Sequence, residues 1–143
     1  MPAIRSQSER TTAEIGRLRE RRAAKAEHVG PLREAVFRFA ESSGASQRTC
    51  QRIALAVSEA LSNCVIHAYA GRDRPGPVTV EAWTHDGSLS VLVADEGRGM
   101  LPRLDSPGLG VGLPMIAQLS DQLEVQTPDD QPGVRLHITF AIV

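Results

Sequence analysis

Two stretches in the first half of the chain carry hydrophobic residues at helical spacing. The first follows Pro31 and stops at Ser43-Gly44, a typical end signal, so the pattern predicts a helix of about ten residues. The second starts at Ser46 and is longer, because its apolar stripe continues until Gly71 and the following Pro-Gly-Pro cluster interrupt it. The apolar positions of this stripe are Cys50, Ile53, Val57, Ala60, Leu61, Cys64, Val65 and Ala68.

The second half of the chain alternates in the manner of β-strands. Residues 78–84 and 89–94 have strand chemistry on either side of His85-Asp86-Gly87-Ser88, which predicts a hairpin. Residues 123–127 and 134–143 form another predicted strand pair, and a short helix is expected at residues 113–119. Residues 15–23 fit either an edge strand or a helix, and their alternating arginines leave both readings open.

This order of elements predicts the fold class. We expect an α/β sandwich, in which a mixed, largely antiparallel sheet is covered on one face by helices. The length of 143 residues allows one domain of ordinary size. We place it at residues 13–143, after a disordered tail at residues 1–12.

Composition and charge exclude several function classes. The net charge is -1 and the aromatics are one Trp, one Tyr and three Phe, so the chain lacks the positive field and the stacking surface of a direct nucleic-acid binder. It has no run of 18 apolar residues and no signal-peptide core, so we expect no membrane partner and a cytoplasmic location. Cys50 and Cys64 lie roughly 21 Å apart along the predicted helix, beyond disulfide reach, and are expected to be reduced.

Basic residues are concentrated near the start of the chain. Arg17, Arg19, Arg21 and Arg22 lie close together, and they belong to the segment that leads into the first predicted helix. A solvated arm and a docking edge for an acidic partner protein both agree with this pattern.

Polar side chains with candidate chemistry lie on the long predicted helix. Glu59, Asn63 and His67 follow one another at intervals of four residues, which stacks them along one side of an α-helix. A carboxylate, a carboxamide and an imidazole in a row can orient a hydroxyl, ligate Mg²⁺ through oxygen and contact phosphate. A solvated helix face has the same spacing and is the simpler alternative.

A glycine-rich loop follows the second strand of the predicted hairpin. Asp95 ends this apolar strand just before Gly97 and Gly99, where backbone can approach a flat ligand closely. Its carboxylate can accept a hydrogen bond from an exocyclic amino group such as that of adenine. A turn that needs Asp and Gly only for its conformation is the alternative.

A second glycine-rich segment precedes the short predicted helix. Gly108, Gly110 and Gly112 offer free N–H groups and a positive helix end to phosphate oxygens. The segment lacks the Gly-Lys-Ser/Thr of a phosphate-binding loop and does not follow the dinucleotide-binding pattern, so the common nucleotide folds are disfavoured.

In this order, the three segments resemble the GHKL ATPase superfamily, the histidine-kinase-like or Bergerat ATP-binding fold. The resemblance is strongest to its anti-sigma factor serine/threonine kinases. Residues 58–69 match the N box, residues 95–99 match the first glycine box and residues 108–114 match the second. The resemblance extends from about residue 24 to the C-terminus.

The resemblance implies ATP and Mg²⁺ as cofactors and a role for each matching residue. Asp95 would bind the adenine amino group, Asn63 would ligate Mg²⁺, Glu59 would be the general base for an acceptor serine, and His67 would lie near the phosphates. Gly97 and Gly99 would flank the base, and Gly108, Gly110 and Gly112 would form the phosphate-side loop.

Two departures from the family pattern bear on nucleotide affinity and turnover. Only residues 100–107 separate the two glycine boxes, where relatives carry a longer ATP lid. Gly133-Val134-Arg135 also stands where relatives tend to have Gly-Thr-Thr, which removes a hydroxyl that can support the adenine pocket.

The function implied by the resemblance is an anti-sigma factor with serine kinase activity. It would bind a sigma factor and phosphorylate a serine on a STAS-type anti-sigma factor antagonist, and a homodimer is compatible with it. Two alternatives stay open at this point. One is a switch kinase of a stress-signalling complex that activates a phosphatase, and the other is a nucleotide-binding interaction module with little catalysis.

Overall fold

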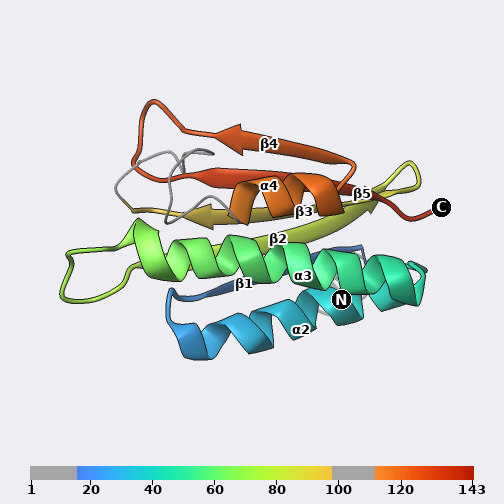
Figure 1. Cartoon of the computed structure of the whole chain (residues 1–143), viewed down its shortest axis with the longest axis horizontal. Helices are drawn as coiled ribbons and strands as arrows, with labels where there is room; N and C mark the ends of the chain where they lie inside the picture. The colour runs from blue at the N-terminus through green and yellow to red at the C-terminus, as the bar shows by residue number, and fades with distance from the viewer. Residues whose placement is uncertain (1–15, 98–111) are drawn as a thin grey trace, which may run out of the picture.

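The computed structural model describes residues 16–97 and 112–143, in which five strands and three α-helices form two layers (Figure 1). The predicted tail, the short lid, Gly99, Gly108 and Gly110 lie outside the described residues. The elements, in chain order, are β1 (Arg17–Ala23), α2 (Ala26–Ser42), α3 (Gln47–Asn63), the π-helix η1 (Cys64–Ala68), β2 (Pro77–His85), β3 (Ser88–Asp95), α4 (Gly112–Leu119), β4 (Gln122–Gln126) and β5 (Arg135–Ala141).

The strands form one sheet in the order β1-β2-β3-β5-β4. The predicted sandwich is confirmed, but each of the described strand pairs is antiparallel, so the sheet is not mixed as expected. The reason is the connectivity: β2–β3 and β4–β5 are antiparallel pairs of strands that are consecutive in the chain. The two remaining pairs, β1–β2 and β3–β5, are antiparallel too, and β1 and β4 are the edge strands. Helices α2, α3 and α4 all lie on one face of the sheet (Figure 1).

The core lies between this sheet face and the helices. Alternate residues of the central strands point into it, as the period-two pattern requires. These residues are Val78, Val80 and Ala82 of β2, Leu89, Val91 and Val93 of β3, and Leu136, Ile138 and Phe140 of β5. The opposite residues form a polar face that no described helix covers. Cys50 and Cys64 are buried and unbridged, which agrees with the prediction for the two thiols.

Helix α2 begins earlier than the sequence pattern predicts. Val29 packs against the core one turn before Leu32, which extends the apolar stripe and stabilises helix on the N-terminal side of Pro31. Helix α3 starts at the predicted Ser46, whose side-chain oxygen caps it by accepting a hydrogen bond from the Thr49 N–H at 3.1 Å. No helix within residues 16–97 and 112–143 is long and apolar enough to cross a membrane.

The predicted hairpin between β2 and β3 is confirmed. Asp86 and Gly87 occupy its turn with φ values of 49° and 77°, as a two-residue hairpin loop requires. The open question about residues 15–23 is also answered, because Arg17–Ala23 is an edge strand paired antiparallel to β2.

Candidate functional site

The site is built around Asp95, the last residue of β3. Its Oδ1 accepts hydrogen bonds from the Gly97 N–H at 2.9 Å and from the Val134 N–H at 3.3 Å. Its Oδ2 faces the Cys64 thiol, whose sulfur lies 3.7 Å away. Two backbone donors therefore fix one carboxylate oxygen, and the other has only a weak thiol donor beside it. This leaves the half-buried Oδ2 with acceptor capacity for a ligand.

Two glycines are required by the close packing around Asp95. A Cβ on Gly97 would collide with the carbonyl oxygen of Ala68, and one on Gly133 would collide with that of Asp95 itself. Gly133 also has φ +123°, which other residues rarely adopt. The neighbouring Val134, which the sequence marks as a departure from the family, supports Asp95 through its backbone N–H rather than through a hydroxyl.

Asn63 joins this region to the start of α4. The side chain projects from the end of α3, and its Nδ2 atom is buried with no hydrogen-bond partner among the described residues. An added Cβ on Gly112 would lie 2.8 Å from this nitrogen, so the first residue of α4 packs directly against the carboxamide. The next residue, Cys64, contacts Asp95. Asn63, Gly112, Asp95 and Gly97, from three separate motifs, therefore converge.

Glu59 and His67 extend the site along the helix axis. Glu59 is half-buried one turn before Asn63, as predicted. His67 is half-buried too, but it lies on the π-helix η1, whose hydrogen bonds join residues i and i+5. The rotation from one residue to the next is therefore smaller there than in an α-helix. The straight stacking of all three side chains expected from an α-helix therefore holds only as far as Asn63.

Tyr69 is a residue of the site that the sequence reasoning missed. Its buried hydroxyl accepts a hydrogen bond from the Glu96 N–H at 2.8 Å and donates to the carbonyl oxygen of Pro77. Burial raises the pKa of Tyr69, and the nearby carboxylates of Asp95 and Glu96 act in the same direction, whereas the bond from the Glu96 N–H lowers it. The sequence feature that could have pointed to Tyr69 is Gly76, because a Cβ at this position would collide with the Tyr69 ring.

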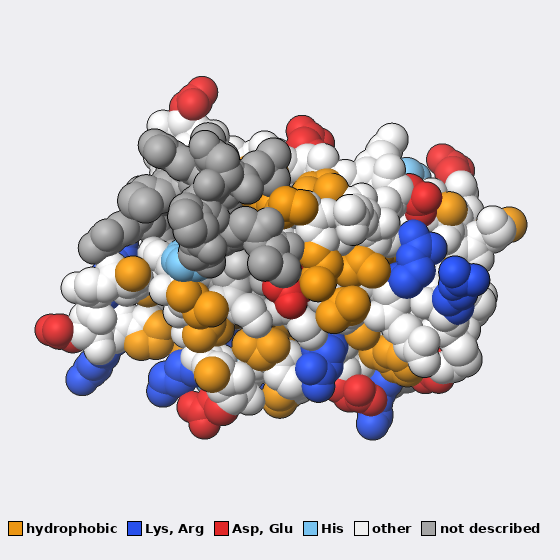
Figure 2. Space-filling model, in the orientation of Figure 1, with side chains coloured by type: hydrophobic (Ala, Val, Ile, Leu, Met, Phe, Trp, Pro, Cys, Tyr) orange, Lys and Arg blue, Asp and Glu red, His pale blue; other side chains and the backbone are white. Residues whose placement is uncertain are grey.

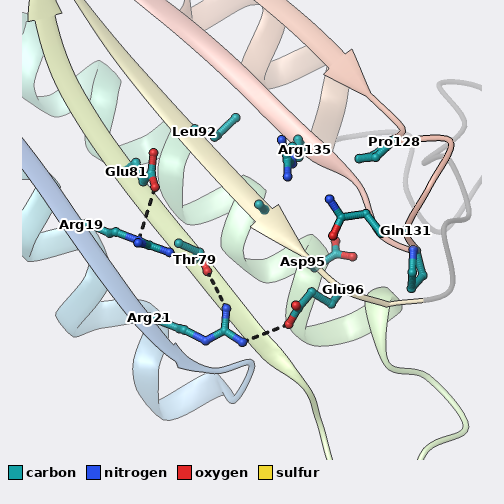
Figure 3. A pocket seen from close by; sticks show the side chains of 12 residues that line it. Arg19, Arg21, Thr79, Glu81, Leu92, Asp95, Glu96, Pro128, Gln131 and Arg135 are labelled. Carbon is teal, nitrogen blue, oxygen red and sulfur yellow. Dashed lines mark hydrogen bonds and ion pairs between the residues drawn. The ribbon is translucent and has the colours of Figure 1, made fainter.

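A cavity of about 250 Å³ opens beside Asp95 on the uncovered face of the sheet (Figure 3). Arg19 and Arg21 of β1 line it together with Asp95, and so do Glu81, Glu96 and Arg135 from other elements. Arg21 pairs with Glu96 at 3.1 Å and Arg19 pairs with Glu81 at 3.4 Å.

These contacts show where the basic segment lies. That the arginines lie away from the adenine side, as the family resemblance implies, stays a prediction, and Arg21 bonds Glu96, the residue that follows Asp95. Each of the four arginines forms an ion pair within the chain, since Arg17 also reaches Glu81 and Arg22 reaches Glu20. The β1 strand is therefore part of the fold and a wall of the cavity beside Asp95.

The donor set fits a nucleotide with a magnesium ion. Asp95 Oδ2 is an anionic acceptor for an amino group, the Asn63 side chain carries a buried, unpartnered nitrogen among the described residues, and Glu59 is a carboxylate on the same helix. Carboxamide and carboxylate oxygens are ligands that Mg²⁺ prefers. The fold and this site together define a nucleotide-binding module of the histidine-kinase type.

Comparison with known protein families agrees with this assignment. Residues 22–140 match the model of the histidine kinase-like ATPase domain. The chain is 32% identical over 125 residues to an anti-sigma F factor of Caldanaerobacter subterraneus subsp. tengcongensis, covering 79% of this chain and 86% of the relative. It is also 31% identical over 119 residues to the serine-protein kinase RsbW of Bacillus pumilus, covering 72% and 74%. The chain belongs to the histidine kinase-like ATPase domain family.

A solved structure supports the fold. The crystal structure of the RsbU and RsbW domains of a Mycobacterium tuberculosis protein superposes with a TM-score of 0.70 at 22% identity. The match covers 88% of this chain and 32% of that one, so the chain spans about a third of that structure. The family, the fold and the class of ATP-dependent serine/threonine kinase predicted from the sequence are confirmed.

Proposed function

We propose that this chain binds ATP with Mg²⁺, regulates a sigma factor and transfers the γ-phosphoryl group of ATP to a serine of a STAS-type anti-sigma factor antagonist. The names of the relatives, anti-sigma F factor and serine-protein kinase, support both halves of this proposal. It acts in the cytoplasm, where ATP and sigma factors are present. The new phosphate adds negative charge to the docking surface of the antagonist and so breaks that contact.

The observation that carries the proposal is the convergence of three motifs at Asp95. The Cys64 sulfur is 3.7 Å from its carboxylate, Gly97 donates to the same carboxylate, and Gly112 packs on Asn63, the residue before Cys64. A solvated helix face and a simple turn, which were the alternatives for the separate motifs, do not require such convergence. A common ligand accounts for it.

Each side chain then has a chemical task. Asp95 Oδ2 accepts the hydrogen bond of the adenine amino group, Asn63 offers its carboxamide oxygen to Mg²⁺, and His67 lies toward the phosphates. Gly97 and Gly112 allow close backbone approach to the base and the phosphates, and we propose the same role for Gly99, Gly108 and Gly110, which lie outside the described residues. The magnesium ion, when bound, neutralises charge on the phosphate oxygens.

Glu59 acts on the acceptor in this mechanism. Its carboxylate accepts the proton of the serine hydroxyl, while a bond forms between the serine oxygen and the γ-phosphorus. The bond between that phosphorus and the β–γ bridging oxygen breaks, and ADP leaves. A positioned base of this kind contributes about 10² to 10⁴ in rate.

The test compares Glu59→Gln with Glu124→Gln, a matched change on the exposed surface of β4. Transfer of labelled phosphate from ATP to purified STAS-domain antagonists is measured beside the affinity for Mg·ATP. We expect Glu59→Gln to reduce the transfer rate about 10²-fold and to keep nucleotide binding, and Glu124→Gln to change neither. Equal transfer rates in the wild type and Glu59→Gln would remove the base role. No transfer by the wild type would favour an interaction module.

A further inference from the structure

Three large apolar side chains are exposed in the described part of the chain, and two of them lie on α3, which carries Glu59, and on η1, which directly follows it. Leu55 of α3 is 44% exposed and Ile66 of η1 is 61% exposed, whereas the third, Val143, is the last residue of the chain. The core-facing side of the same helix buries its apolar residues completely. Leu55 and Ile66 therefore contribute little to the core and leave apolar surface in water.

Helical geometry places the two exposed side chains on either side of Glu59. Leu55 precedes Glu59 by four residues and shares its helix face, about 6 Å away along the axis. Ile66 follows Glu59 by seven residues, about 10 Å along the axis, and lies on the π-helix η1, where the rotation per residue is smaller than in α3. The half-buried Ser62 lies between Glu59 and Ile66 along the axis. Leu55, Glu59, Ser62 and Ile66 together form what we call the Glu59 face.

The Glu59 face lacks the charges of an ordinary solvated helix. Residues 53–71 contain a single acidic residue, Glu59, and no Lys or Arg, although 23% of the whole chain is charged. Figure 2 shows hydrophobic side chains gathered over α3 and α4 on this side of the molecule. Depletion of charge around exposed apolar side chains is typical of the centre of a protein–protein interface.

We infer that the Glu59 face is the docking surface for the protein that carries the acceptor serine. This inference rests on the proposed function, because it uses Glu59 as the group that receives the serine proton. The serine hydroxyl must come within about 3 Å of the Glu59 carboxylate. A folded protein that brings it there also covers Leu55 and Ile66, which lie about 6 Å and about 10 Å from Glu59 along the helix axis.

The chemistry of the face specifies the partner. The acceptor protein presents apolar side chains on both sides of its serine and no acidic group directly opposite Glu59, since two carboxylates would repel. After transfer, Glu59 releases the serine proton to water, and the phosphoserine then faces the Glu59 carboxylate and an apolar surface. Both features disfavour a dianion, so the product dissociates.

The test is the double variant Leu55→Gln/Ile66→Gln, which removes apolar surface without adding charge or shortening the side chains much. The probe is a purified STAS-domain antagonist that the wild-type chain phosphorylates, and initial rates are measured over a range of its concentrations. We expect KM for the antagonist to rise about tenfold, while kcat and the Kd for Mg·ATP stay within about twofold. Val143→Gln, the same kind of change on the third exposed apolar side chain, leaves all three constants unchanged.

Several results would overturn the inference. An unchanged KM in a folded double variant would show that the acceptor docks elsewhere. A shift from dimer to monomer in sedimentation, with KM unchanged, would assign the face to a second copy of the chain. If the double variant fails to fold, Ile66→Gln alone decides, with a rise of about threefold expected and an unchanged KM contradicting it. Absence of transfer by the wild type is a separate outcome, which defeats the proposed function and this inference together.

Discussion

Replacing Tyr69 by Phe removes one oxygen atom that joins three segments of the site. The hydroxyl accepts from the Glu96 N–H, next to Asp95, and donates to the carbonyl oxygen of Pro77 at the start of β2. The ring stays in place, because Gly76 leaves room for it and the substitution does not alter its carbons. Tyr69→Phe is therefore a change of hydrogen bonding with little change of packing.

The expected loss of stability follows from the two backbone groups that lose the hydroxyl, the Glu96 N–H and the Pro77 C=O. A part-buried backbone N–H and a part-buried C=O lose their partner, and each such group costs about 1–3 kcal/mol. Glu96 is exposed to water, so we expect the lower half of the summed range, about 2–4 kcal/mol in total. For a chain of this size, that loss lowers Tm by about 4–16 °C.

Thermal and denaturant unfolding measure this loss, and Mg·ATP titration measures the effect on the site. We expect nucleotide affinity to decrease by about threefold to tenfold, because Glu96 is no longer held and Asp95 precedes it. Trp83→Phe, a matched aromatic change on the uncovered sheet face, should leave nucleotide affinity unaltered. A change in Tm below about 1 °C, or a nucleotide affinity equal to that of the wild type, would refute the reasoning.

Three further predictions concern other contacts of the site. Gly112→Ala places a methyl group against Asn63 Nδ2 and should weaken Mg²⁺-dependent nucleotide binding about tenfold, as measured by titration. The control is Gly30→Ala in α2, where the nearest atom to the added methyl group would be 3.8 Å away, and it should not change this binding. Arg21→Glu places a second carboxylate beside Glu96 and should weaken Mg·ATP binding about threefold, with a stability loss below about 1 kcal/mol. Arg17→Glu, farther from Glu96 along β1, should leave Mg·ATP binding intact. A larger loss of binding in Arg17→Glu than in Arg21→Glu would contradict the position of β1. Burial raises the pKa values of the Cys64 thiol and the Tyr69 hydroxyl above their usual 9.0 and 10.0, so the neutral forms are the stabilising ones. The free energy of unfolding should therefore be constant just below pH 9 and decrease above it, with a smaller decrease in Cys64→Ala; a flat profile up to pH 11 would contradict these shifts.

Local patterns were sufficient to predict most of the fold. Ser46 caps α3 as expected, and the turn at Asp86-Gly87 forms the hairpin, because both depend on residues close together in the sequence. The state of residues 17–23 could not be decided in this way. Arg17, Arg19 and Arg21 find their carboxylate partners on Glu81 and Glu96, 62 to 75 positions away, and the backbone of the segment pairs with β2.

The candidate site was predictable as a set of residues but not as a geometry. Glu59, Asn63 and Asp95 carry recognisable chemistry, so pattern and resemblance were enough to select them. The π-helix at Cys64–Ala68 depends on tertiary packing, since the Ala68 carbonyl lies against Gly97 and the following Tyr69 bonds to Glu96 and Pro77. No spacing rule anticipates such contacts, and they decide where His67 lies.

The account depends most directly on Asp95 as the residue that reads the base, and calorimetric titration of Asp95→Asn with Mg·ATP tests this. Asparagine keeps the Oδ1 acceptor for the Gly97 and Val134 N–H groups, so the fold should persist, but it presents an NH₂ group in place of Oδ2. A donor then faces the adenine amino group. We expect the wild type to bind Mg·ATP and Asp95→Asn, with an unchanged unfolding profile, to bind it at least about tenfold more weakly. Equal affinity of the two proteins for Mg·ATP would contradict it.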